Sequence, residues 1–231
     1  MSELWEAEAR RYDAGYDGAG REGRVIRARQ AEALELLGDG PGRVVDVGMG
    51  GGRLCLALTS RGWEVSGIDP SEAMVALARS RMPDTHERLV VGRAEALPFA
   101  DGSFDAVATR VAAHHFDDVP AAVHEMARVS SNLVLVVDNL FMSDAAEEAD
   151  KLRDPSHVRN YTGEEWRAML GDAGVEVEEV RRFDKPIEFQ PWLDRVGCEG
   201  EDAERVRELL ADRIEDGWVQ LDRIAVKGRK A

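Results

Sequence analysis

Asp46 stands two residues before a cluster of glycines in the stretch VVDVGMGGGR. The glycines have the spacing G-x-G-x-G, at Gly48, Gly50 and Gly52. A dinucleotide-binding fingerprint would have its third glycine where this chain has Arg53. A carboxylate beside the loop would repel a pyrophosphate and attract an ammonium or sulfonium group. The stretch therefore indicates a cationic ligand that has no phosphate.

A second acid, Asp69, follows Gly48 by about 20 residues, at the end of the next apolar run. An acid at this distance is placed to bind the hydroxyls of a ribose. Pro70 then restricts the backbone, Ser71 can cap the following helix, and Met74 is placed to cover an adenine ring. The alternative is that Asp69 only caps the helix and Met74 belongs to the core.

His114 and His115 come just after the fourth strand-like run, FDAVAT. Open α/β sheets bind ligands at the carboxyl ends of their strands, and histidine is the side chain best suited to act as a base near neutral pH. We expect at most one of the two rings to face the ligand. That ring either acts as a base or lines the pocket, while the other packs under the loop or is solvated.

A later segment, RDPSHVRNY, concentrates basic and aromatic side chains in an acidic protein. Its candidates for contact with an acceptor molecule are Arg153, His157, Arg159 and Tyr161. The arginines could clamp a carboxylate or phosphate through paired hydrogen bonds. Alternatively, they form ordinary surface ion pairs with Asp154 and Glu164. Trp192 either lines the acceptor pocket from another side or belongs to the core.

The elements that would position these residues alternate along the chain. Strand-like runs cover residues 43–47, 63–69, 88–92, 104–109, 132–138, 174–183 and 218–228. Segments with helical periodicity lie between them, at 54–62, 71–82, 117–129, 164–174 and 201–214. Alternation of this kind predicts an α/β fold with a doubly wound sheet of seven strands. Thr162 and Glu165 form a T-x-x-E capping box that should begin the fourth of these helices.

Composition limits the classes of function. The chain has 231 residues, 44% of them hydrophobic, and a formal net charge of −15. We expect one domain over residues 1–231. The negative charge opposes nonspecific binding to nucleic acid or to an anionic membrane, and no apolar run reaches the roughly 20 residues of a membrane span. The two cysteines form no C-x-x-C pair, so we expect a cytoplasmic protein without a metal site.

Four motifs, taken in order, resemble those of a known family: DVGMGGG, GIDPSEAM, GRAEALPFADGSFD and RVAAHHF. The chain is similar to class I S-adenosylmethionine-dependent methyltransferases, and most of all to the ubiquinone and menaquinone biosynthesis type of the methyltransferase domain family. The resemblance spans about residues 5–183. It implies a Rossmann-like sheet, mostly parallel with an antiparallel last strand, and a helical lid. The implied activity is methyl transfer to O, N or C of a small molecule, with S-adenosylhomocysteine as the product.

The resemblance also implies roles for individual residues. The glycine loop would approach the methionine part of the cofactor, Asp46 its amino group and Asp69 its ribose. Further cofactor contacts are implied for Ala94 and Glu95 at the adenine edge, Arg110 near the methionine moiety, and Tyr12 in an N-terminal lid over residues 1–30. Residues 140–162 and 186–216 would form the lid on the acceptor side, in a monomer or homodimer.

One departure concerns the adenine. Family members commonly have Asp where this chain has Arg93, and an arginine cannot accept a hydrogen bond from the adenine amino group. The adenine contact would then fall to other groups, such as the Ala94 backbone N–H.

Two other classes compete with the methyltransferase. One is a protein of the same fold that binds the cofactor without transferring the methyl group, either a ring-closing enzyme or a regulatory module. The other is an NAD-dependent oxidoreductase, which Arg53 and Asp46 disfavour. A nucleic acid acceptor is disfavoured by the net charge and by RVAAHH in the place of an N-P-P-Y motif.

Overall fold

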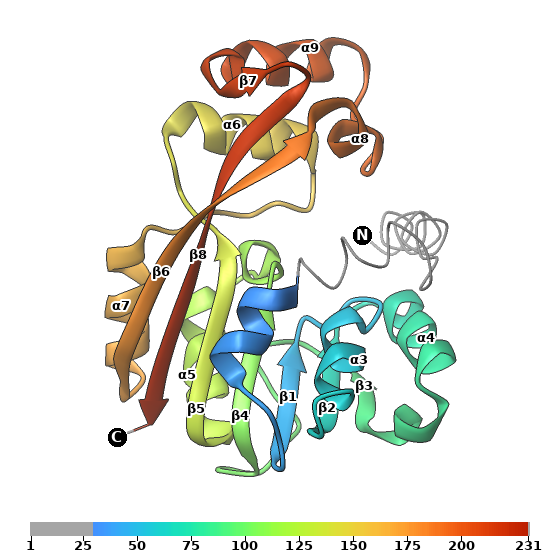
Figure 1. Ribbon diagram of the computed structural model, residues 1–231, viewed down its shortest axis with the longest axis vertical. Helices are drawn as coiled ribbons and strands as arrows, with labels where there is room; N and C mark the ends of the chain where they lie inside the picture. Colours follow the sequence, from blue (N-terminus) through green and yellow to red (C-terminus); the bar gives the residue numbers. More distant parts are fainter. Residues whose placement is uncertain (1–29, 231) are drawn as a thin grey trace.

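The apolar runs form one mixed sheet in the computed structural model, which describes residues 30–230. The strand order is β3-β2-β1-β4-β5-β8-β6, and the short β7 pairs with β8 off this path (Figure 1). Strands β1 to β5 pair in parallel, whereas β8 runs antiparallel to both β5 and β6. The bounds are β1 Arg43–Val47, β2 Glu64–Asp69, β3 Leu89–Val91, β4 Phe104–Arg110, β5 Ser130–Asn139, β6 Val175–Glu188, β7 Ile214–Glu215 and β8 Trp218–Lys230. The predicted Rossmann-like fold, with its antiparallel last strand, is confirmed.

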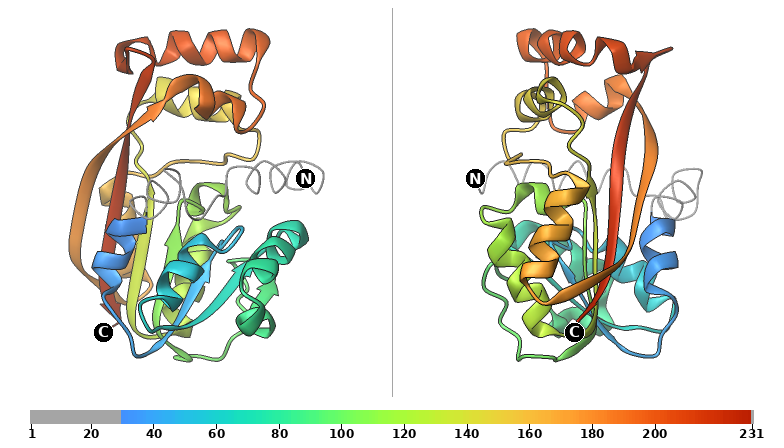
Figure 2. Two further views of the ribbon diagram at one scale, coloured as in Figure 1. Left: turned by 45° about the vertical axis from the view of Figure 1, so that its right-hand side comes forward. Right: turned by 90° about the vertical axis from the view of Figure 1, so that its left-hand side faces the viewer.

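Helices cover both faces of this sheet because successive side chains of each buried strand point to opposite faces. Val45 of β1 packs with the helices α5 (Val119–Val129) and α7 (Gly163–Asp172). Its neighbour Val44 packs on the other face, with the helical residues 30–37 and with α3 (Arg53–Thr59) and α4 (Glu72–Arg81). Figure 2 shows the two layers of helices with the sheet between them. The crossovers therefore bring the carboxyl ends of β1, β2, β4 and β5 to one edge.

The predicted capping box is present at the start of α7. The Glu165 N–H donates to Thr162 Oγ1 at 3.2 Å, and the Thr162 N–H donates to Glu165 Oε2 at 2.8 Å. The two side chains satisfy two backbone donors that would otherwise lack partners at the helix N-terminus.

Three helices pack beyond the carboxyl edge of the sheet, at the top of Figure 1: α6 (Asp144–Arg153), α8 (Phe189–Asp194) and α9 (Gly200–Leu209). They share a separate apolar cluster that includes Ala149, Trp192 and Val206. The long strands β6 and β8 rise from the sheet to join this cluster. The cluster therefore lies over the edge where the parallel strands end.

Two predicted boundaries in this region are wrong, and two helices, α6 and α8, were not among the predicted helical segments. Strand β6 continues past 183 to Glu188, because an edge strand tolerates Pro186, which has no N–H to pair. Helix α9 ends at Leu209 rather than 214, where η3 (Ala211–Arg213) and β7 follow. The sequence of α6, DAAEEADKLR, gives little helical signal because the side chains that the helix buries are small or acidic: Ala146, Ala149 and Asp150. Within residues 30–230, no helix is long and apolar enough to cross a membrane.

Candidate active site

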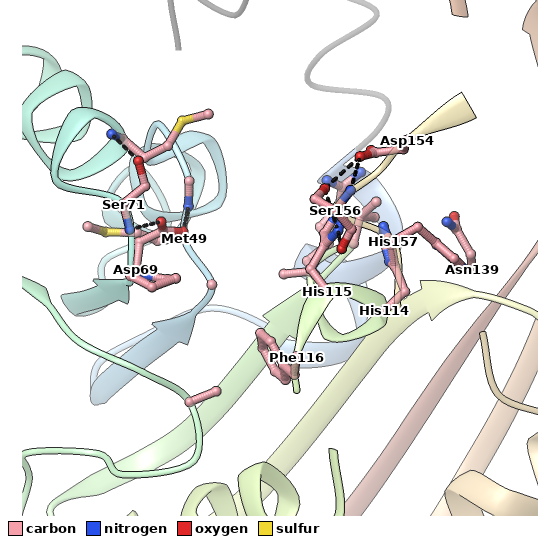
Figure 3. A pocket seen from close by; sticks show the side chains of 18 of the residues that line it. Met49, Asp69, Ser71, His114, His115, Phe116, Asn139, Asp154, Ser156 and His157 are labelled. Atoms are coloured by element: carbon pink, nitrogen blue, oxygen red, sulfur yellow. Dashed lines mark hydrogen bonds between the residues drawn. The ribbon is translucent and has the colours of Figure 1, made fainter. Parts of the chain in front are cut away.

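A cavity of about 680 Å³ lies between the carboxyl edge of the sheet and the cluster of α6 and α8. Figure 3 shows the β1 and β2 loops on one side, with Asp69 and Ser71, facing a histidine cluster on the other. Among the described residues, most of the predicted site lines this one space: Asp46, Gly48, Gly50, Asp69, Pro70, Met74, Ala94, Glu95, Arg110, His114, His115, Arg153, His157 and Trp192. Tyr12 lies outside the described residues.

The glycine loop is tied to the tip of β2. The Gly50 N–H donates to Asp69 Oδ2 at 2.8 Å, and the Ser71 N–H donates to Asp69 Oδ1 at 3.0 Å (Figure 3). Burial raises the pKa of Asp69, and these two donors partly offset the shift. Gly48 has φ +74, and a Cβ on it would lie 2.5 Å from Ala112 Cβ. Only glycine allows the loop to lie this close to the segment after β4.

Gly52 has a different role from the one predicted. It does not line the cavity. Its φ is +77, and an added Cβ would lie 2.7 Å from Met82 Cε, at the end of α4. Gly52 therefore allows the start of α3 to pack closely against α4. Met74, in contrast, lines the cavity and is also buried, with 3% of its surface exposed.

Asp46 is a buried carboxylate that faces the cavity, with 2% of its surface exposed. Burial raises its pKa from 3.8 to about 7, although a Cys55 Sγ donor at 3.4 Å and the nearby Arg110 favour the charged form. A carboxylate with so little solvation gains free energy from a cation placed beside it. This chemistry fits the ammonium and sulfonium groups of S-adenosylmethionine.

The adenine end of the predicted site carries an ion-pair network. Arg93 Nη2 lies 2.6 Å from Asp117 Oδ2 and 3.3 Å from Glu95 Oε1. The Asp117 backbone N–H also donates to Glu95 Oε1 at 3.0 Å. Arg93, Ala94, Glu95 and Asp117 all line the cavity. A carboxylate thus borders the cavity here even though position 93 holds arginine.

His114 is the most firmly held group at the far side of the cavity. Its backbone N–H donates to Asp138 Oδ2 at 2.8 Å, and its Nδ1 lies 2.6 Å from Asp138 Oδ1. Burial opposes ionisation of Asp138, but the His114 ring and the Asn139 N–H hold the pKa of Asp138 below its usual value. The ionised Asp138 accepts a hydrogen bond from the Nδ1–H of His114, and in this tautomer Nε2 carries the lone pair of the ring.

The expectation that only one histidine faces the cavity is wrong. The short helix η2 (Ala113–His115) places both rings at the edge of the sheet, with centroids 4.0 Å apart. His115 Nδ1 lies 3.0 Å from the Ser156 carbonyl oxygen and 3.1 Å from Ser156 Oγ (Figure 3). Burial lowers the pKa of His115 to about 3, and the adjacent His114 adds to the shift. His115 is therefore neutral throughout the physiological range.

The cluster predicted in RDPSHVRNY divides into two parts. Arg153 and His157 line the cavity, whereas Arg159 and Tyr161 do not, which corrects the prediction for those two. Arg159 stacks 4.8 Å from the Tyr161 ring centroid and pairs with Glu165 at the start of α7. Residue 161 also forms a bridge with Leu140, next to β5, and its ring packs against Trp166 at 5.4 Å. These contacts hold the second half of the segment away from the cavity.

His157 is held by helix α6. Its Nε2 lies 3.1 Å from Glu147 Oε1, and its ring centroid lies 5.5 Å from that of His114. The neighbouring Val158 N–H donates to the His114 carbonyl oxygen at 2.8 Å. The segment that contains His157 and Val158 thus connects η2 to helix α6.

Several cavity residues were not predicted as site residues. They are Asn139, Asp150, Asp154, Lys185, Arg195 and Arg223. One signal was present, because the polar pair Asp138 and Asn139 ends a strongly apolar run. The other residues reach the cavity only because α6, α8, β6 and β8 fold back over the sheet, which the sequence of each segment does not reveal.

The sheet order, the glycine loop after β1 and the acid at the end of β2 define the Rossmann-like class of cofactor-binding proteins. Residues 45–133 match the family described as methyltransferase domain. The uncharacterized methyltransferase YcgJ of Bacillus subtilis is 35% identical over 178 residues, which are 73% of this chain and 69% of that protein. Its crystal structure matches with a TM-score of 0.78 and 29% identity, over 90% of this chain and 98% of that one.

Two further proteins are similar to this chain. The malonyl-acyl-carrier protein O-methyltransferase of Geobacter sulfurreducens is 32% identical over 193 residues, 77% of this chain and 72% of that protein. The crystal structure of the 4+2 cyclase SpnF matches with a TM-score of 0.66 over 93% of this chain and 85% of that one, but at 19% identity it shows only the fold. The chain therefore belongs to the class I S-adenosylmethionine-dependent methyltransferases.

Proposed function

We propose that this protein transfers the methyl group of S-adenosylmethionine to a small-molecule acceptor, at O, N or C. When bound, the cofactor would supply a methyl group on a positively charged sulfur, and S-adenosylhomocysteine would leave as a neutral thioether. Asp46 would bind its ammonium group, Asp69 its ribose hydroxyls, and the segment from Ala94 to Asp117 its adenine. The glycine loop would allow the backbone to approach the methionine part.

The observation that carries this proposal is that His114, which pairs with the buried Asp138, lines the same cavity as the glycine loop. Asp138 holds the His114 ring at Nδ1, so Nε2 can accept a proton from an acceptor hydroxyl, amine or acidic carbon. Alignment of the two reactants would supply the remaining rate enhancement, since well-oriented reactants reach effective molarities of about 10⁵ to 10⁸ M.

We also propose that residues 140–162 and 186–216 act as the acceptor-side lid; the separate N-terminal lid expected over residues 1–30 lies, apart from Gln30, outside the described residues. The first two segments contain α6 and α8, which contribute Arg153 and Trp192 to the cavity wall. Their apolar cluster is separate from those of the sheet, so these helices have packing of their own above the site. Closure over the bound reactants would exclude water from the methyl transfer.

Two measurements test the proposed function. Isothermal titration should show binding of S-adenosylmethionine and none of NADH; the reverse result would refute the proposal. Release of S-adenosylhomocysteine should then be measured against a panel of small hydroxyl, amine and carbon acids. Binding of the cofactor without release for any acceptor would instead support a protein that does not transfer the methyl group.

The role of His114 has a matched control. His114→Gln should lower kcat by about 10²- to 10⁴-fold, the usual contribution of a general base, with the affinity for S-adenosylhomocysteine unchanged. His124→Gln should leave kcat unchanged, because the His124 ring is on the exposed side of α5 and contacts only the Pro120 carbonyl oxygen among its described hydrogen-bond partners. Equal kcat values for the two variants would remove His114 from the mechanism.

A further inference from the structure

The charges that line the cavity are unevenly distributed. The end formed by α6, α8, β6 and β8 carries four basic side chains, Arg153, Lys185, Arg195 and Arg223. The same end carries two carboxylates, Asp150 and Asp154. The opposite end, near the glycine loop, carries five carboxylates, Asp46, Asp69, Glu72, Glu95 and Asp117, against three arginines, Arg53, Arg93 and Arg110. A basic concentration is notable in a chain whose formal net charge is −15.

Arg153 is held in a defined position at the basic end. Its guanidinium stacks on Trp192, 4.5 Å from the ring centroid, and only 11% of its side chain is exposed. Its described polar contacts are long, at 3.4 Å to the Trp192 carbonyl oxygen and 3.5 Å to Asp154 Oδ2. Its Nε is buried and donates no hydrogen bond. A planar guanidinium placed in this way retains donors for an oxyanion.

Two more basic residues come from the strands that rise above the sheet. Lys185 of β6 is paired with Leu221 of β8, so their side chains share a face. Arg223 lies two residues further along β8 and therefore on the same face, directly across from Asn139 of β5. All four line the cavity. The strand register thus extends one basic wall from the end of β5 toward α8.

The two carboxylates at this end are engaged by local donors. Asp150 Oδ2 accepts from Asn160 Nδ2 at 2.7 Å. Asp154 Oδ1 accepts from the Ser156 N–H at 3.0 Å and from Ser156 Oγ at 2.6 Å (Figure 3). Burial opposes ionisation of Asp154, but these donors and Arg153 hold its pKa below the usual value. Both acids are therefore held by nearby donors, and Arg153 meets Asp154 only at 3.5 Å.

We infer that the methyl acceptor carries an oxyanion, a carboxylate or a phosphate, which Arg153 binds together with the wall of Lys185, Arg195 and Arg223. The reacting atom of such an acceptor would lie toward His114, between the basic end and the cofactor end. This inference rests on the proposed function, whose acceptor it assigns to a chemical class.

The test compares acids with their neutral partners. The protein is saturated with S-adenosylhomocysteine, and isothermal titration measures the binding of a library of small hydroxyaryl and hydroxyalkyl carboxylic acids and their methyl esters. A second arm compares phosphate monoesters with the parent alcohols, which distinguishes the two oxyanions. At least one acid or phosphate should bind ten-fold or more tightly than its neutral partner, and the acceptors found by S-adenosylhomocysteine release should belong to the anionic set.

Matched arginine variants locate the site. Arg153→Met should weaken binding of the anionic probe at least ten-fold and leave that of its neutral partner unchanged, and Arg195→Met should act in the same direction. Arg159→Met is the control, because Arg159 is in the same loop and stacks on an aromatic ring, but its guanidinium pairs with Glu165 away from the cavity. Unchanged affinity for S-adenosylhomocysteine shows that the variants are folded.

Three results would overturn the inference: no anion binding better than its neutral partner, an equal loss for both partners in Arg153→Met, or an equal loss in Arg159→Met. Each of these can occur in a protein that binds S-adenosylmethionine and transfers its methyl group. They are thus distinct from failure of the proposed function, which would appear as absence of cofactor binding or of methyl transfer.

Discussion

Replacing Asp46 with Asn tests the contribution of the buried carboxylate to cofactor binding. Burial raises the pKa of Asp46 from 3.8 to about 7. This shift means that ionisation costs the ligand-free protein about 4 kcal/mol more than it costs an exposed carboxyl group, at about 1.36 kcal/mol per pKa unit. A cationic ligand binds the ionised form, so ligand binding and proton release from Asp46 are coupled.

The coupling has a defined sign and size. Below pH 7 the carboxyl group is increasingly protonated, so the affinity for S-adenosylmethionine should fall about ten-fold for each pH unit, and a proton should be released on binding. Isothermal titration between pH 5.5 and 8, in buffers of different ionisation enthalpy, measures both quantities. Asp46→Asn should abolish this dependence and weaken binding at pH 8 by about 10- to 100-fold, the value of a charge-assisted hydrogen bond.

The control is Asp105→Asn, which removes a half-exposed carboxylate that contacts Arg43 at the other end of the sheet. This variant should bind the cofactor as the wild type does at every pH. An affinity of the wild type that is constant from pH 6 to 8, or a pH dependence retained in Asp46→Asn, would refute the reasoning. The ligand-free wild type should also lose stability from this group as the pH rises from about 4 to 7, because the folded state holds the proton more tightly than the unfolded state does.

Other predictions concern the base, the loop and the helices. Asp138→Asn should lower kcat by about 10²-fold or more with cofactor affinity unchanged, since His114 loses the acceptor that orients its ring; unchanged kcat would contradict this. Gly48→Ala should destabilise the fold by more than about 1 kcal/mol and abolish cofactor binding, because φ is +74 and the new Cβ meets Ala112. Gly171→Ala, in α7 with open space around the added Cβ, should instead raise stability by about 0.5 to 1 kcal/mol in denaturant unfolding. Thr162→Ala should cost about 1 kcal/mol by the same measurement, and no loss would show that the capping box is dispensable.

The succession of strands and helices along the chain and the cofactor end of the site could be predicted from the sequence because both depend on local patterns. Apolar periodicity distinguishes buried strands from helices over a few residues. The glycine loop and Asp69 lie at the ends of adjacent strands, so a parallel sheet necessarily brings them together. The Gly50 N–H bond to Asp69 is the direct result. Gly52 shows the limit of this reasoning, because its spacing did not reveal that it packs against α4.

The acceptor end depended on tertiary structure. Arg153 and Arg159 are six residues apart in one loop, and no local pattern distinguishes them. The bond from the Val158 N–H to the His114 carbonyl oxygen and the bridge between Leu140 and residue 161 decide which arginine faces the cavity.

The same holds for the basic wall and for the catalytic pair. Lys185 and Arg223 reach the cavity only because β6 and β8 extend beyond the sheet, which the alternation within each strand does not reveal. His114 meets Asp138 through the packing of η2 against the end of β5, across 24 positions of sequence. Local periodicity thus determined the sheet and the cofactor loop, whereas contacts between distant segments decided which side chains meet the acceptor.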